Sequence, residues 1–121
     1  MATILLVDDD ESVREMLKTA LSRFRHSVID ASSAKEALAR FKPGVIDVVV
    51  TDILMPDEDG LTVIRKLRDG ESDVKIVAIS GGGKAGPDNY LNLARALGAD
   101  RVIPKPFSIN ELIGIVEELT G

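Results

Sequence analysis

The chain has 121 residues, and its 20 acidic residues outnumber its 15 basic ones, which gives a formal charge of −5 with the single histidine neutral. This length predicts one domain. The acidic balance argues against direct nucleic-acid binding, which usually needs a basic surface. The absence of cysteine excludes disulfides and thiolate metal sites. No apolar run approaches the roughly 20 residues of a membrane span, and the start MATILLVDDD lacks the pattern of a signal peptide. We therefore expect a cytoplasmic domain without membrane contact.

Two kinds of apolar segment alternate along the chain. Short runs rich in β-branched residues predict strands that are buried on both faces of a parallel sheet. These runs cover residues 3–7, 28–29, 46–51, 74–79 and 101–103.

Helical periodicity follows each run. The first helix is expected to bury one face, made of Val13, Met16, Leu17, Ala20, Leu21 and Phe24. Capping boxes predict helix starts at Ser33, with Glu36 three residues on, and at Ser108, with Glu111. The remaining two helices are expected over residues 60–68 and 87–98. Five β-α units in this order predict an α/β fold with right-handed crossovers and an open parallel sheet.

Function in such a sheet is expected at the carboxyl ends of the strands. Asp8 and Asp9 follow the first strand, Asp52 ends the third, Ser80 ends the fourth, and Lys105 follows the fifth. Two carboxylates about 4 Å apart repel by roughly 4 kcal/mol at an effective dielectric near 20, so three of them either raise a pKa or recruit a cation. Oxygen ligands suit Mg²⁺ or Mn²⁺. Asp10 and Glu11 are expected only to favour a helix start.

These residue types together are typical of phosphoryl transfer. An aspartate can act as the nucleophile and form an aspartyl phosphate. A metal ion and a lysine neutralise charge on the transferring oxygens, and a hydroxyl binds a further oxygen.

Four segments resemble the receiver domain of bacterial two-component response regulators, the fold typified by the chemotaxis response regulator. They are ILLVDDDESVREML (4–17), VVVTDILMPDEDG (48–60), AISGG (78–82) and LGADRVIPKPF (97–107). The resemblance covers residues 1–121 as one receiver domain. It implies a doubly wound (βα)5 fold whose five parallel strands lie in the flavodoxin-like order 2-1-3-4-5.

The resemblance also implies a role for each site residue. Asp52 would be the phospho-acceptor, Asp9 a direct Mg²⁺ ligand, Asp8 a ligand partly through water, and the Leu54 carbonyl a further ligand. Ser80 would move towards the phosphoryl group, and Lys105 would pair with the acceptor or the phosphate. The Lys105-Pro106 bond is expected to be cis.

The implied function is a phosphorylation-activated switch in a phosphorelay. The phosphoryl donor would be a sensor histidine kinase or a histidine phosphotransfer protein, and an unknown target protein would read the changed surface. Such a chain is not an enzyme beyond its own phosphorylation and dephosphorylation.

Four features depart from the family pattern or stand apart from the site. Val102 occupies the position of the usual Tyr or Phe, so we expect the output face to respond through residues 81–90, where the loop 81–86 is rich in glycine. Arg25 stands where glycine is common and is expected in left-handed geometry or at a differently ended helix. His26 is expected on the surface or at a strand edge.

One enzyme reading competes with the receiver. Asp8 and Asp10 fit the signature of haloacid-dehalogenase-type phosphatases. That family needs acidic metal ligands after the lysine, and residues 106–121 offer only Glu111, Glu117 and Glu118, all in the last helix. A P-loop is disfavoured because Ala78 and Ala85 break its motif. An FMN site is disfavoured by one tyrosine and three phenylalanines.

Overall fold

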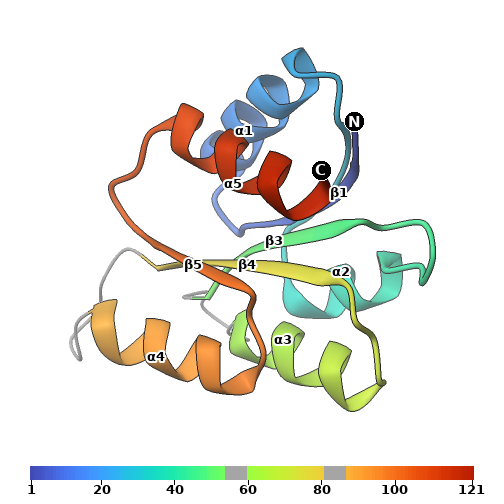
Figure 1. The fold of residues 1–121 in the computed structure, drawn as a ribbon, viewed down its shortest axis with the longest axis vertical. Coiled ribbons are helices and arrows are strands. Elements are labelled where there is room, and N and C mark those ends of the chain that lie inside the picture. Colours follow the sequence, from blue (N-terminus) through green and yellow to red (C-terminus); the bar gives the residue numbers. More distant parts are fainter. Residues whose placement is uncertain (54–59, 81–86) are drawn as a thin grey trace.

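The computed structural model describes residues 1–53, 60–80 and 87–121, with the backbone alone for residues 87–91. Within these ranges five strands alternate with five helices (Figure 1). The strands are β1 (Thr3–Val7), β2 (Ser27–Ala31), β3 (Val48–Asp52), β4 (Lys75–Ser80) and β5 (Arg101–Pro104). The helices are α1 (Glu11–Arg23), α2 (Ala34–Arg40), α3 (Gly60–Asp69), α4 (Pro87–Leu97) and α5 (Ile109–Thr120). The predicted alternation is confirmed.

All strand pairs are parallel, and the sheet order is β2-β1-β3-β4-β5, as expected. Helices α1 and α5 cover one face of the sheet, and α2, α3 and α4 cover the other (Figure 1). The order reverses between β1 and β3, which lie side by side. Their carboxyl ends therefore meet where ligands bind in open α/β sheets.

The core has two halves because alternate strand residues point to opposite faces. In β1, Ile4 and Leu6 pack under α1 and α5, while Leu5 and Val7 pack under the other three helices. Every residue of β3 is buried. Strands covered on both faces are mostly apolar, which explains why they read as nearly continuous apolar runs in the sequence.

Side-chain caps begin three of the helices. Ser33 accepts a hydrogen bond from the Glu36 N–H at 3.1 Å, and Ser108 accepts one from the Glu111 N–H at 3.0 Å, as the capping boxes predicted. Asp10 caps α1 by accepting from the Val13 N–H at 3.2 Å. Within the described ranges, no helix combines the length and apolar character that crossing a membrane requires.

The predicted buried face of α1 is too wide. Leu17 and Leu21 are buried, but Met16 is 53% exposed and Phe24 is 47% exposed. The helix ends at Arg23, and Phe24 is its C-cap, so the last predicted position lies beyond the face that contacts the sheet.

His26 is buried, so the surface position that was one of its two expected places is wrong. It directly precedes the edge strand β2, which agrees with the other expectation, a strand edge. Arg25 adopts the left-handed conformation expected for it, with φ of 68°. This turns the chain back so that the His26 N–H bonds to the Leu21 carbonyl, and the ring nitrogen Nδ1 accepts from the Ala2 N–H at 3.1 Å. His26 therefore packs against the start of β1, at the opposite end of the strand from Asp8.

Candidate functional site

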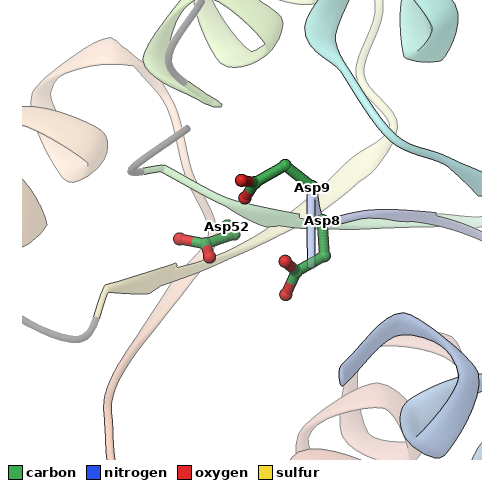
Figure 2. A group of neighbouring side chains, drawn as sticks. All are labelled: Asp8, Asp9 and Asp52. Carbon is green, nitrogen blue, oxygen red and sulfur yellow. The ribbon is translucent and has the colours of Figure 1, made fainter. Parts of the chain in front are cut away.

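The acidic cluster (Asp8, Asp9 and Asp52) lies where β1 and β3 end. Val7 pairs with Thr51 in the sheet register, so the next residues along each strand are brought together. One carboxylate oxygen of each residue lies within 4.8 Å of those of the other two. Figure 2 shows Asp8 and Asp9 on one chain segment and Asp52 on the neighbouring strand. The predicted meeting of these three carboxylates is confirmed.

A tight turn fixes the β1 end of the cluster. The Asp8 N–H donates to the Ala31 carbonyl at 3.1 Å, which continues the β1–β2 pairing by one residue. The Asp8 carboxylate accepts from the Asp10 N–H at 2.9 Å. The chain then enters α1 directly, and both Asp8 and Asp9 stay at the carboxyl end of β1.

Electrostatics in the cluster favour a proton or a cation. Burial raises the pKa of Asp8, and the nearby charges of Asp52 and Asp9 raise it further. The hydrogen bond from the Asp10 N–H and the charge of Lys105 oppose that rise without cancelling it. A buried carboxylate beside two others is costly while it is ionised, so a positive ligand gains affinity there.

Lys105 supplies one positive charge to the site. Its Nζ lies 3.1 Å from Oδ2 of the buried Asp52. The Lys105 N–H donates to the Ser80 carbonyl at 2.8 Å, which places the lysine beside the end of β4. The Lys105-Pro106 peptide is cis, as expected. Three carboxylates and one ammonium leave a net charge of −2, which one divalent cation would balance.

Ser80 ends β4 next to β3 and is fully buried. Its Oγ has no hydrogen-bond partner among the residues that the structure describes. A buried hydroxyl without a partner is costly and needs an explanation. A phosphoryl oxygen at the neighbouring Asp52 would be a suitable partner.

Gly60, the first residue of α3, shapes the site through the space that it leaves open. Its N–H donates to the Ile53 carbonyl at 3.1 Å, so the start of α3 lies against the residue that follows β3. A Cβ at Gly60 would lie 2.1 Å from the Asp52 carbonyl oxygen and 2.8 Å from the Thr51 hydroxyl. Only a residue without a side chain lets α3 begin so close to the Asp52 backbone.

Some predicted features lie outside the described residues. They are the Leu54 carbonyl and the glycine-rich loop at residues 81–86. Val102 is described: it is half-buried and packs against the core half under α2, α3 and α4.

The phosphatase alternative finds no support in the geometry. It requires Asp10 to act beside Asp8, but the Asp10 side chain caps α1 through the Val13 N–H. The three acidic residues after Lys105 all lie within α5.

Comparison with known proteins agrees with the fold. The family model of the response regulator receiver domain matches residues 4–117. The chain is 34% identical over 118 residues to the DNA-binding transcriptional regulator NtrC of Azospirillum brasilense, and 38% identical over 123 residues to the sensor kinase CckA of Brucella abortus. These matches cover 96% and 98% of the chain, but only 24% and 12% of the two relatives.

A solved structure matches over the whole fold. It is the crystal structure of the response regulator protein TrrA from Thermotoga maritima in complex with Mg²⁺-BeF. The TM-score is 0.84 at 34% identity, and the match covers 98% of this chain and 99% of that one.

Proposed function

This chain belongs to the response regulator receiver domain family of two-component systems, and from that premise we propose that Asp52 is the residue that accepts the phosphoryl group. The observation that carries the proposal is the ion pair between Lys105 and Asp52 inside the acidic cluster. Asp52 ends a central strand whose residues are all buried, so its carboxylate is held by a rigid element. Catalytic carboxylates need such fixed positions.

We assign Asp8, Asp9 and Asp52 to a divalent cation, Mg²⁺ by preference and Mn²⁺ as an alternative, with the Leu54 carbonyl as a further ligand. The donor set fits, because close oxygen ligands with exposed positions for water suit a hard divalent ion. The solved structure of TrrA contains Mg²⁺-BeF, which supports this assignment. The ion would neutralise charge on the transferring phosphoryl oxygens.

The chain's own residues carry the transfer. A carboxylate oxygen of Asp52 attacks the phosphorus of a phosphohistidine; the new O–P bond forms as the P–N bond breaks, and the imidazole leaves with the electron pair. Lys105 pairs with the negative charge that builds up on the phosphoryl group. The Ser80 hydroxyl donates to a phosphoryl oxygen and so gains the partner it lacks among the described residues.

The donor would be a sensor histidine kinase or a histidine phosphotransfer protein. A relative named as a sensor kinase contains a segment similar to this chain, which fits such a partnership. The cytoplasm would be the site of the reaction. Beyond its own phosphorylation and dephosphorylation, the chain would turn over no separate substrate.

Phosphorylation would act as a switch on protein partners. The new charge and acceptor oxygens bias a domain with two conformations. Val102 replaces the aromatic side chain that usually couples the hydroxyl residue to the output face, so we expect the backbone of residues 81–90 to carry the response. Residues 1–121 would act as one receiver domain.

Intact-mass spectrometry tests the acceptor assignment. The chain is incubated with a small-molecule phosphodonor and Mg²⁺, as wild type, as Asp52→Asn and as Asp47→Asn. Asp47 is a matched control because it precedes the same strand at the other end of the sheet and is exposed. We expect a phosphoryl adduct on the wild type and on Asp47→Asn and none on Asp52→Asn. An adduct on Asp52→Asn at the wild-type rate would contradict the proposal.

A further inference from the structure

Arg14 of α1 links the acidic cluster to the edge strand β2. Its Nη1 donates to the Asp8 carbonyl oxygen at 2.9 Å, and its Nε donates to Asp30 Oδ2, also at 2.9 Å. One acceptor directly follows β1 and the other lies in β2, and one planar guanidinium holds both. Because the donors of a guanidinium have a fixed geometry, the contact at one end restricts the position of the other.

Asp30 is itself firmly held. Lys18 Nζ lies 3.3 Å from its Oδ1, and the Arg40 side chain donates to its backbone carbonyl. Burial alone would raise the pKa of Asp30, but the hydrogen bonds and charges of Arg14 and Lys18 together lower it. The side chains of Arg14 and Asp30 are only 14% and 22% exposed. The anchor for Arg14 is thus an ionised carboxylate that is partly shielded from water.

The Asp8 carbonyl belongs to the peptide that joins Asp8 to Asp9. Rotation of this peptide would turn the two carboxylates relative to each other. The Asp8 N–H bond to Ala31 fixes the preceding peptide, and the Asp10 N–H bond to the Asp8 carboxylate fixes the following one. The bond from Arg14 fixes the peptide between them.

We propose that Arg14 is a positioning residue for the divalent cation site, which it serves by anchoring the Asp8–Asp9 peptide to Asp30. The proposal rests on the cation site assigned above. Groups that hold metal ligands from outside the coordination shell typically change metal affinity by about 10- to 100-fold when they are removed.

The direction in which Mg²⁺ affinity changes when Arg14 is removed distinguishes a positioning role from a purely electrostatic one. Arg14 is a cation that is hydrogen-bonded to the Asp8 backbone, next to the acidic cluster, so its positive charge alone repels Mg²⁺. If Arg14 acted only through charge, its removal would tighten Mg²⁺ binding. Positioning predicts weaker binding in spite of that electrostatic gain.

Lys18 offers a matched control. It also carries one positive charge on α1 and also contacts Asp30, but among the described residues it does not bond to the Asp8 backbone. Lys18→Met therefore removes a charge and one contact to Asp30 without touching the Asp8–Asp9 peptide. Arg14→Lys makes the complementary change, because it keeps the charge but loses the rigid fork.

The experiment measures Mg²⁺ affinity by titration of the full chain, followed through backbone amide chemical shifts at the end of β1. The wild type is compared with Arg14→Met, Arg14→Lys and Lys18→Met, and a urea midpoint without Mg²⁺ confirms that each variant is folded. We expect Kd to rise on the order of tenfold for both Arg14 variants and not to rise for Lys18→Met.

Unchanged or tighter Mg²⁺ binding by either folded Arg14 variant would overturn the positioning role. A rise in Kd for Lys18→Met as large as that for Arg14→Met would also overturn it. Loss of a contact to Asp30 would then be enough to weaken Mg²⁺ binding, without any change at the Asp8–Asp9 peptide. A wild type that does not bind Mg²⁺ at all would instead overturn the cation site itself. Should Arg14→Met fail to fold, Arg14→Lys decides the question.

Discussion

The acidic cluster should destabilise the folded chain when no cation is present, and Asp8→Asn tests this directly. Asp8 and Asp52 are buried, and their carboxylate oxygens lie within 4.8 Å of each other. Asparagine keeps the shape of the side chain and the oxygen that accepts from the Asp10 N–H. The substitution therefore removes one charge and little else.

The expected magnitude follows from the geometry. At 4.8 Å and an effective dielectric of about 20, two carboxylates repel by about 3.5 kcal/mol. The attraction between Asp8 and Lys105 offsets part of this repulsion. We expect Asp8→Asn to raise the free energy of unfolding in Mg²⁺-free buffer by about 1–2 kcal/mol, which corresponds to a rise in Tm of about 3–8 °C for a domain of this size.

Mg²⁺ should reverse the order of stability of the wild type and the Asp8→Asn variant. At a free concentration about 100 times its Kd, Mg²⁺ stabilises the wild type by about 2.7 kcal/mol. The Asp8→Asn variant lacks one of the three carboxylates and should gain much less. Thermal unfolding with and without Mg²⁺ measures both effects, and Asp10→Asn is the control because it removes the same charge from the α1 cap, where asparagine caps well.

Two outcomes would refute this reasoning. One is a loss of stability for Asp8→Asn in Mg²⁺-free buffer, which would mean that the cluster does not repel itself. The other is an equal shift for Asp8→Asn and Asp10→Asn, which would assign the effect to net charge rather than to the cluster.

Four further predictions concern the residues of the site and its immediate surroundings. Gly60→Ala should lower the free energy of unfolding by about 2 kcal/mol or more, because its Cβ would overlap the Asp52 carbonyl, whereas Gly114→Ala, in open space on α5, should raise it by up to about 1 kcal/mol in urea unfolding. Asp8 must lose its proton to bind Mg²⁺, and its pKa is raised above the ordinary value of 3.8. As the pH is lowered, Mg²⁺ affinity should therefore begin to fall before pH 3.8 is reached, which titrations at a series of pH values measure. For the same reason protonated Asp8 favours folding in Mg²⁺-free buffer at low pH, and this contribution is lost as the pH rises through the raised pKa; Asp8→Asn should remove that pH dependence. Lys105→Met should slow phosphorylation of Asp52, measured by the rate of adduct formation, while Mg²⁺ still binds.

The sequence predicted the sheet well because both faces of each central strand are covered. The run at residues 3–7 coincides with β1, whereas the run at 46–51 starts before β3, which begins at Val48. Ile46 is buried in the connection that leads into the strand, so its apolar character does not mark the strand boundary. Burial and strand pairing are different properties, and periodicity reports only the first.

Helix faces were predicted less well. Periodicity gave the direction of the α1 stripe, and Leu17 and Leu21 lie on it. Periodicity could not show that the Met16 and Phe24 side chains are exposed rather than packed against the sheet. The burial of His26 depends on a contact with Ala2, 24 residues away, and local pattern carries no signal for such a contact.

In the site, too, some residues could be placed from the sequence and others could not. Asp8, Asp9 and Asp52 could be placed together because the carboxyl ends of neighbouring parallel strands must meet. Arg14 could not be assigned, since it looks like any charged residue of an amphipathic helix until β2 places Asp30 beside it.

The central claim is that Asp52 carries the phosphoryl group, and chemical trapping locates it most directly. Borohydride reduces an aspartyl phosphate to homoserine, which marks the modified position permanently. After phosphorylation with a small-molecule donor and Mg²⁺, reduction and peptide mapping should find homoserine at position 52 and aspartate at positions 8 and 9. Homoserine at position 8 or 9, with aspartate retained at 52, would contradict the account.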